Sequence, residues 1–231
     1  MRVHVAFTPG ERAPAELGIV VDVLRATSTI VQALAAGYER VLCCAEVDEA
    51  RAIAADERSA VLAGERRAVR IPGFRFGNSP RELAGEAEAE TLVLTTTNGT
   101  RLLVAAAARY ERVLVGSLLN LDALAREVRE SGAAEVAVLC AGVGGEVALD
   151  DAYCAGRIAA ALEGSLADSA AVAVRLADSF ESPEEGLAAG QSARNLRAAG
   201  LEEDIEWCAR VGVVDVVPEL RGTVGVAVEV R

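Results

Sequence analysis

Lysine is absent from this sequence of 231 residues, so all 23 of its basic residues are arginine. The absence excludes a Schiff base, a lysine general base and the lysine of a P-loop. Histidine occurs only once, at His4, inside an apolar segment that predicts a strand. A single histidine in such a segment argues against Ser-His-Asp catalysis and against phosphotransfer through histidine. We expect His4 to lie in the core or at the edge of the fold.

The five cysteines follow no metal-binding or redox pattern. They form no C-x-x-C pair and no zinc spacing, and none has an arginine six positions later, which excludes the phosphocysteine type of phosphatase. An odd number of cysteines, the first three in apolar strand-like segments, predicts reduced and buried thiols in a cytosolic protein. The cysteines are Cys43, Cys44, Cys140, Cys154 and Cys208.

Long apolar runs and net positive charge are also missing. No apolar run approaches the roughly 18 residues of a transmembrane helix, and the first residues predict a strand rather than a signal peptide. The net charge is −12, and an acidic surface repels nucleic acid and anionic lipid. We therefore expect a soluble, cytoplasmic protein without nucleic-acid or membrane partners. On general grounds a homodimer is the expected assembly.

Short apolar segments alternate with helical patterns rich in alanine, glutamate and arginine along most of the chain. This alternation predicts a mainly parallel, or mixed, sheet covered by helices on both faces, which is a three-layer α/β/α architecture. No linker is evident, so we predict one α/β domain over residues 1–231, with two closely associated lobes (about 1–116 and 117–231) as the alternative. The last two strands are expected at 213–217 and 223–230.

The stretch from Gly18 to Thr29 has the features of a strand followed by a functional turn. Its apolar start predicts a buried strand. Asp22, Arg25 and a run of hydroxyl residues that begins with Thr27 follow where that strand should end. In open α/β sheets, ligands bind outside the carboxyl ends of the strands, next to helix N-termini. The alternative is local, with Thr27 or Ser28 capping a helix and Asp22 pairing with Arg25.

Similar polar turns follow the other predicted strands. The carboxyl ends of parallel strands lie along one rim of a sheet, so turns that are distant in sequence can converge there. Hydroxyls, amides at helix N-termini and arginines bind phosphate, and carboxylates without histidine or cysteine suit Mg²⁺. The pattern predicts a magnesium-assisted site for a phosphorylated anion. The turns contain Glu65 and Arg66, Asn78 and Ser79, Thr96 to Thr100, Ser117 and Asn120, and Asp150 and Asp151.

Each of these turns also has a local interpretation. Asn98-Gly99 can be a plain turn, Asp150-Asp151 can cap a helix and compensate its dipole, and Glu65-Arg66 can be a solvated charge pair. The segment from Gly77 to Pro80 is the hardest to explain locally, because a long loop with this chemistry is often functional. The shared position of these polar turns after predicted strands favours the prediction of a functional site.

Five ordered segments, covering about residues 18 to 156, resemble the 2-phosphosulfolactate phosphatases of coenzyme M biosynthesis. The resemblance implies an α/β/α fold and the hydrolysis of (R)-2-phospho-3-sulfolactate to 3-sulfolactate and phosphate, with Mg²⁺ required. Two departures occur: Val143 and Gly144 stand where a threonine and a large residue are expected, and Asp150-Asp151 replaces Glu-Asp. The similar segments are Val21 to Thr29, Gly64 to Arg66 with Gly73 to Pro80, Thr96 to Thr100, Gly116 to Asn120, and Cys140 to Gly142 with Leu149 to Asp151.

On this resemblance the polar residues receive roles as a hypothesis. The residues assigned to catalysis are Asp22, Arg25 and Asn98. Those assigned to substrate binding are Arg25, Thr27, Ser28, Arg66, Asn78, Ser79, Thr97, Asn98, Gly99, Thr100 and Ser117. Those assigned to Mg²⁺ are Asp22, Glu65, Asp150 and Asp151.

Two questions stay open at the level of sequence. The nucleophile is either a water molecule or Asp22 itself. The alternative functions are a magnesium-dependent phosphatase of another phosphorylated hydroxy acid and a protein that binds phosphate or another anion without catalysis. The loss of a hydroxyl at Val143 is the sequence feature that favours the non-catalytic alternative.

Overall fold

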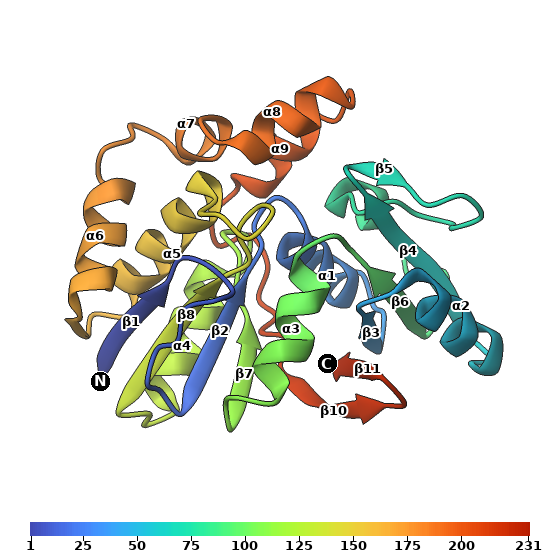
Figure 1. Ribbon diagram of the computed structural model, residues 1–231, viewed down its shortest axis with the longest axis horizontal. Coiled ribbons are helices and arrows are strands. Elements are labelled where there is room, and N and C mark those ends of the chain that lie inside the picture. Colours follow the sequence, from blue (N-terminus) through green and yellow to red (C-terminus); the bar gives the residue numbers. More distant parts are fainter.

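The computed structural model describes all residues from 1 to 231, and it contains two β-sheets with helices packed around them (Figure 1). The first sheet is parallel throughout and has the strand order β7-β2-β8-β1-β9. Its central strand positions are apolar, and all five residues of β2 are buried, as is typical of a strand covered on both faces. The strands are β1 (Arg2–Ala6), β2 (Leu17–Val21), β7 (Arg112–Val115), β8 (Glu135–Cys140) and β9 (Ser165–Leu166).

The second sheet is mixed and has the order β10-β11-β3-β6-β4-β5. Strands β3, β6 and β4 are parallel, whereas β11 and β5 run antiparallel to β3 and β4. Each sheet takes strands from both sides of residue 116. The strands are β3 (Arg40–Cys44), β4 (Ala60–Arg66), β5 (Val69–Arg70), β6 (Thr91–Thr95), β10 (Leu220–Val224) and β11 (Ala227–Val230).

Helices cover both sheets, in agreement with the predicted α/β/α class. Figure 1 shows α1 and α3 between the sheets and α7 to α9 grouped beyond the ends to which β1 and β4 point. No helix combines the length and the apolar character needed to cross a membrane. The helices are α1 (Ala26–Ala35), α2 (Val47–Asp56), α3 (Gly99–Ala107), α4 (Leu121–Glu130), α5 (Leu149–Ala161), α6 (Asp168–Ala177), α7 (Pro183–Ala188), α8 (Gln191–Ala198) and α9 (Glu203–Cys208), with a short 3₁₀ helix at Pro80–Leu83.

Two large apolar clusters hold these layers together. One, of 30 buried residues, packs α4, α5 and α6 on the outer face of the first sheet. The other, of 24, contains Val20 of β2, Leu94 of β6, and Ile30 and Leu103 of the helices between them. The second cluster therefore joins the two sheets through α1 and α3, and it fixes the carboxyl ends of β2 and β6 relative to each other.

The C-terminal strands differ from the prediction. Residues 213–217 form no strand. They follow the loop after β7, where Val214 donates its amide to the Leu119 carbonyl and Asn120 donates to the Val216 carbonyl. Residues 223–230 form a hairpin rather than one strand, because Gly225 with φ +60° reverses the chain between β10 and β11. The expectation of buried thiols is confirmed, since all five cysteines are free and buried.

Candidate active site

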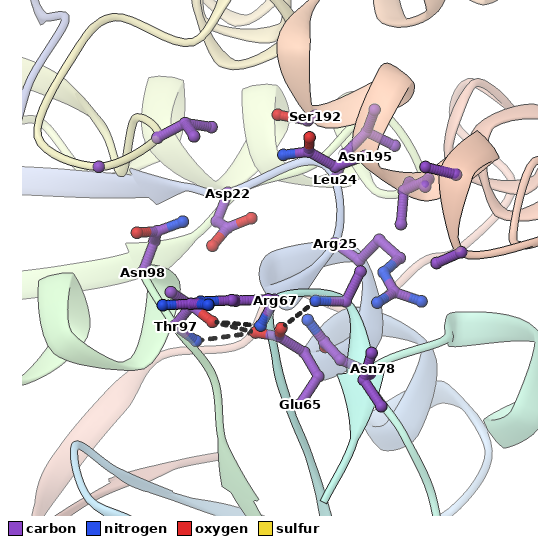
Figure 2. A pocket seen from close by; sticks show the side chains of 17 residues that line it. Asp22, Leu24, Arg25, Glu65, Arg67, Asn78, Thr97, Asn98, Ser192 and Asn195 are labelled. Carbon is purple, nitrogen blue, oxygen red and sulfur yellow. Dashed lines mark hydrogen bonds between the residues drawn. The ribbon is translucent and has the colours of Figure 1, made fainter.

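A cavity of about 600 Å³ lies where the carboxyl end of β2, the β4–β5 hairpin and helix α8 meet. Figure 2 shows polar side chains from these elements surrounding it. The two sheets and the C-terminal helices all contribute, so the cavity depends on the whole fold. Its lining consists of Asp22, Leu24, Arg25, Glu65, Arg67, Ala68, Val69, Asn78, Thr97, Asn98, Val143, Gly144, Ser192, Asn195, Leu196, Ala198 and Ala199.

Asp22 follows β2 directly and points into the cavity (Figure 2). Its Oδ1 accepts a hydrogen bond from the Ala26 amide at 3.3 Å, and its side chain is largely buried, with 8% exposed. Thr27 Oγ1 donates to the Asp22 carbonyl at 3.0 Å, and Ser28 Oγ donates to the Val23 carbonyl at 2.9 Å. These two hydroxyls are fully buried and close the turn. They lie outside the lining and hold the turn that carries Asp22. The local alternative is wrong in its details, because α1 has Arg25 at its N-cap without a side-chain cap and Arg25 pairs with Asp204 instead of Asp22.

Burial raises the pKa of Asp22 to about 7. The negative charges of Asp150 and Glu65 contribute to this rise of the pKa, and the amides of Ala26 and Gly99 oppose it. A carboxylate in a cleft with a perturbed pKa and a specific set of charged neighbours is typical of functional sites. The fold therefore disfavours the ionised form of Asp22, and a cation in the cavity would favour it.

Arg25 is held from behind by a carboxylate that the sequence analysis did not select. Its Nη1 donates to Asp204 Oδ2 at 2.7 Å, and the side chains are 3% and 0% exposed. The other oxygen of Asp204 accepts a hydrogen bond from Ser79 Oγ at 2.6 Å. Asp204 thus ties the turn after β2 to the loop before the 3₁₀ helix. Its neighbours Glu202 and Glu203 give the local sequence the pattern of an exposed first helical turn, so no signal in the sequence marks Asp204 as buried.

Glu65 joins two loops at the floor of the cavity. Oε1 accepts hydrogen bonds from the Thr97 amide at 2.8 Å and the Thr97 hydroxyl at 2.9 Å, and Oε2 accepts one from the Ala68 amide at 2.7 Å (Figure 2). Hydrogen bonds to an ionised acceptor are among the strong ones. Glu65 is buried, so it braces the β4–β5 turn against the loop after β6 in addition to facing the cavity.

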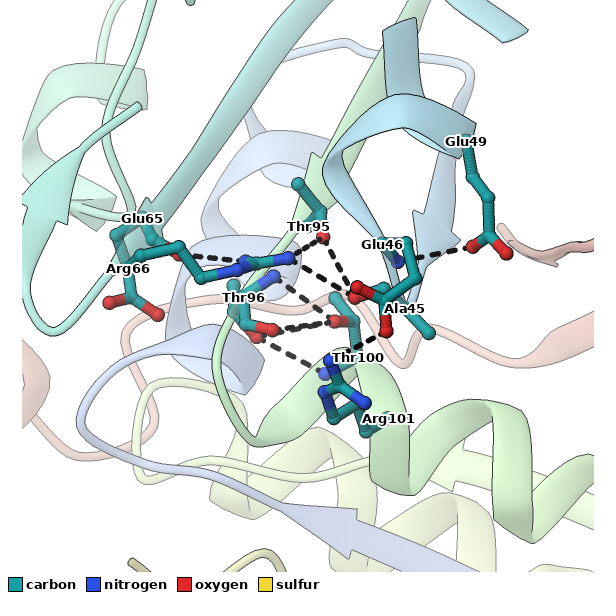
Figure 3. A network of polar contacts seen from close by, with 9 residues as sticks. All are labelled: Ala45, Glu46, Glu49, Glu65, Arg66, Thr95, Thr96, Thr100 and Arg101. Carbon is teal, nitrogen blue, oxygen red and sulfur yellow. Dashed lines mark hydrogen bonds and ion pairs between the residues drawn. The ribbon is translucent and has the colours of Figure 1, made fainter. Parts of the chain in front are cut away.

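Arg66, which was expected to bind substrate, does not line the cavity. Figure 3 shows its guanidinium turned toward the loop between β3 and α2. It donates to the carbonyls of Glu65 and Ala45 at 2.8 and 3.1 Å and to Thr95 Oγ1 at 2.9 Å. The next residue, Arg67, lines the cavity instead. Side chains alternate between the two faces of a strand, and Arg66 follows Glu65 at the end of β4, so it points away from the cavity that Glu65 faces.

The loop after β6 places Asn98 in the lining and begins α3. Thr96 and Thr100 hydrogen-bond each other's amides at 3.1 and 3.2 Å (Figure 3), so Thr100 caps this turn and stays outside the cavity. Gly99 is required for a close approach: a Cβ there would lie 2.5 Å from Ala26 Cβ and 2.6 Å from Asp22 Oδ2. Without a side chain at Gly99, the N-terminus of α3 faces the Asp22 carboxylate.

Two further residues assigned to substrate are placed differently from each other. Asn78 lines the cavity with 4% of its surface exposed, and its Oδ1 is the one buried side-chain oxygen or nitrogen without a hydrogen-bond partner. An unsatisfied buried polar atom at a cavity is typical of a ligand contact. Ser117 is fully buried, and its amide donates to Asn120 Oδ1 at 3.0 Å. It organises the turn after β7, away from the lining.

Asp150 and Asp151 begin α5 and lie behind the cavity rather than in its lining. Asp151 accepts the amides of Val23 and Gly142, each at 2.9 Å, and so joins the turns after β2 and β8. Asp150 accepts the Ser192 hydroxyl at 2.8 Å. Burial raises the pKa of Asp150 to about 6 and that of Asp151 well above its usual range, with Asp150 and Asp22 adding to the second rise.

The four carboxylates assigned to Mg²⁺ therefore separate into a cavity-facing pair, Asp22 and Glu65, and a pair behind it, Asp150 and Asp151. No group of three or more histidine, cysteine, aspartate or glutamate side chains is placed to hold a metal ion by itself. The front pair still fits Mg²⁺, which is usually held by one or two carboxylates together with substrate phosphate and water. Of the rear pair, Asp150 acts on Asp22 through its charge, which raises the pKa of Asp22.

Part of the lining escaped the sequence analysis. Val143 and Gly144, noted there as departures, form one wall. The remainder comes from Leu24 in the turn after β2, from the β4–β5 hairpin and from α8 with the residue that follows it. These unpredicted lining residues are Leu24, Arg67, Ala68, Val69, Ser192, Asn195, Leu196, Ala198 and Ala199.

Comparison with known proteins identifies the family of this chain. The family model of 2-phosphosulpholactate phosphatase matches residues 5–223. A Thermus thermophilus protein named probable 2-phosphosulfolactate phosphatase is 41% identical over 233 aligned residues, which cover 98% of both chains. A Deinococcus radiodurans protein of the same name is 36% identical over 225 residues, covering 95% of this chain and 93% of the relative.

A third relative comes from Methanothermobacter thermautotrophicus and is named 2-phosphosulfolactate phosphatase. It is 35% identical over 232 residues, which cover 100% of this chain and 98% of the relative. The family model and the relatives thus extend over both sheets and over the C-terminal helices that complete the cavity. The chain belongs to the 2-phosphosulfolactate phosphatase family, and it is a phosphoric monoester hydrolase.

Proposed function

We propose that this protein hydrolyses (R)-2-phospho-3-sulfolactate to 3-sulfolactate and phosphate and that Mg²⁺ is required. The observation that carries the proposal is the position of Asp22, a buried carboxylate at a strand end that faces both the N-terminus of α3 and the cavity beside Arg25. A phosphoryl group in this position would meet amide donors, a guanidinium and a carboxylate together.

The charges of the cavity support a requirement for a cation. Asp22 and Glu65 face the cavity, and Asp150 adds to the negative charge at Asp22. Arg25 is already paired with Asp204. A substrate with phosphate, sulfonate and carboxylate groups would be repelled by these carboxylates unless a cation were present. Asp22 and Glu65 are the residues that would hold Mg²⁺, which when bound would neutralise phosphoryl charge and orient the attacking water.

The protein's own residues provide the positioning that phosphoryl transfer needs. Arg25, fixed by Asp204, presents its guanidinium to one side of the phosphate. The start of α3, with Asn98 in the lining, presents its amides on another side, and the helix dipole favours an anion there. Asn78 offers its unpaired Oδ1 to a donor such as the attacking water or the product hydroxyl.

The test is phosphate release from racemic 2-phospho-3-sulfolactate, measured with Mg²⁺ and with EDTA. 2-Phospholactate and p-nitrophenyl phosphate serve as comparison esters, and Asp22→Asn serves as the inactive control. We expect magnesium-dependent release that stops when half of the racemate is consumed and that favours the sulfonated ester. Preferred release from another ester would move the function to another phosphorylated hydroxy acid, and release from none would refute the proposal.

A further inference from the structure

The turn between β4 and β5 is built from residues that do not favour its conformation. Strands β4 and β5 pair Glu65 with Arg70 and Arg66 with Val69, which leaves Arg67 and Ala68 as a two-residue turn. Both have positive φ, 55° and 65°. Such turns prefer Asn-Gly, because side chains other than Asn, Asp and Gly are strained at positive φ. The conformation is retained here by the Glu65 carboxylate, which accepts the Ala68 amide at 2.7 Å.

This turn delivers Arg67 to the cavity. Figure 2 shows the Arg67 side chain beside Thr97 and Asn98, on the side opposite Arg25. Arg67 is exposed, lines the cavity and forms no ion pair. The other arginine of the lining, Arg25, is committed to Asp204. Arg67 is therefore a second cavity-lining cation, and unlike Arg25 it has no carboxylate partner.

The position of Arg67 selects the part of the substrate that it can reach. The phosphate belongs in the interior, next to Asp22 and the start of α3. In 2-phospho-3-sulfolactate the carboxylate is attached to the carbon that bears the phosphate, whereas the sulfonate is attached one carbon further away. The sulfonate therefore extends furthest from the phosphate and toward the exposed rim where Arg67 lies. The rim residues Ala68 and Val69 offer apolar contact to the methylene group that joins the sulfonate to the phosphate-bearing carbon.

We propose that Arg67 binds the sulfonate of the substrate and determines the preference of this protein for a sulfonated ester. The assignment rests on the proposed function and deepens it. Its guanidinium can donate two parallel hydrogen bonds to two sulfonate oxygens, the geometry in which arginine binds oxyanions best. The unfavourable backbone at Arg67 is then explained by function, because local strain is commonly kept where it positions a group for a ligand.

The experiment measures kcat/KM for 2-phospho-3-sulfolactate and for 2-phospholactate, which lacks the sulfonate, in Arg67→Ala and in the wild type. Losing a hydrogen-bonded ion contact should lower the value for the sulfonated ester by about 10- to 100-fold and the value for phospholactate by about 3-fold or less. Arg70→Ala is the matched control, because Arg70 lies on the same hairpin but outside the lining. It should change either value by about 2-fold or less.

A second variant separates specificity from folding. Arg67→Asn fits the positive φ of the turn better than arginine does, so it should melt at or above the wild-type temperature while losing the preference for the sulfonate. The assignment of Arg67 is overturned, and the proposed function is kept, if the wild type is active and both Arg67 variants retain its preference for the sulfonated ester. An equal fall of kcat/KM for both esters in these variants overturns the assignment in the same way. A wild type that hydrolyses neither ester overturns the proposed function, and the assignment of Arg67 with it.

Discussion

Replacing Asp22 by asparagine should remove activity and, at alkaline pH, make the protein more stable. Asp22 is buried, and its pKa rises from 3.8 to about 7 through burial and the charges of Asp150 and Glu65. The difference corresponds to about 4 kcal/mol of unfavourable interaction when the carboxylate is ionised. Asparagine keeps the hydrogen bond from Ala26 but turns an NH₂ group toward the Gly99 amide, which costs about 1 kcal/mol or more. The net gain at pH 8 is about 2–3 kcal/mol.

The pH dependence gives the sign of this effect. A carboxyl group whose pKa is higher in the folded protein than in the unfolded chain favours folding when it is protonated. The wild type should therefore lose stability as the pH rises from about 4 to about 7, whereas Asp22→Asn loses less. At pH 5 its advantage should shrink by about 2–3 kcal/mol and nearly vanish.

Urea unfolding and thermal melts in EDTA, at pH 5 and pH 8, measure this prediction. At pH 8 the melting temperature of Asp22→Asn should lie about 5–10 °C above that of the wild type. Asp56→Asn is the control, because Asp56 is exposed and forms no ion pair; it should change the unfolding free energy by about 0.5 kcal/mol or less. Millimolar Mg²⁺ should stabilise the wild type more than Asp22→Asn. Equal stabilities at pH 8, or a gain that is the same at pH 5, would refute the electrostatic reasoning.

Three further substitutions test other parts of the site. Gly99→Ala should lower kcat/KM at least about 10-fold and destabilise the fold by about 1–3 kcal/mol, because the new Cβ would lie 2.5 Å from a neighbouring methyl group. Gly85→Ala is its control, because a Cβ at Gly85 would have no atom within 4 Å. Equal effects of the two substitutions would contradict the argument that Gly99 is needed for a close approach. Asp204→Ala leaves Arg25 unpaired in the interior and should cost about 3–5 kcal/mol in urea unfolding, so wild-type stability would exclude the buried pair. Arg66→Met should lower the unfolding free energy by about 1–3 kcal/mol and leave kcat/KM nearly unchanged for both esters. A loss of activity without a loss of stability would show that Arg66 binds the substrate after all.

The α/β class was predictable from the sequence, because the strand-helix alternation is produced by local patterns of apolar residues. The prediction was wrong at the C-terminus, where residues 213–217 form no strand. Their apolar, β-branched composition favours a strand, yet their backbone groups bond to the loop after β7 instead. Such pairing is decided by tertiary contacts, which a local pattern does not contain. The hairpin turn at Gly225 is visible in the sequence, because a glycine inside a strand pattern commonly marks a break in the strand.

The candidate site divides along the same line. Asp22, Arg25, Glu65, Asn78 and Asn98 stand at strand ends in the sequence, and the structure places all of them in the lining. The hydroxyl residues were the ambiguous part, since the same side chains serve as phosphate ligands and as turn or helix caps. Nothing in a linear pattern distinguishes a hydroxyl that faces the cavity from one that faces its own backbone.

The contribution of α8 and α9 could not be predicted, because it depends on where two distant segments come together. Asp204 is separated from Arg25 by 179 positions, yet the two side chains form a fully buried ion pair. Only the packing of α9 on the turn after β2 brings them into contact. The sequence marks such a residue neither by spacing nor by motif, and its acidic neighbours disguise it as part of a solvated helix.

The arrangement of carboxylates suggests how the site combines stability with reactivity. Asp151 and Glu65 have their oxygens occupied by hydrogen-bond donors, mostly backbone amides, and so fix the loops around the cavity. Asp22 accepts one side-chain hydrogen bond, from the Ala26 amide, and it faces the cavity between the start of α3 and Arg25. Part of the unfavourable electrostatics of the fold therefore lies on a carboxylate that faces the cavity. A cation and a phosphoester bound together would relieve that cost, so part of their binding energy would act directly at the reacting centre.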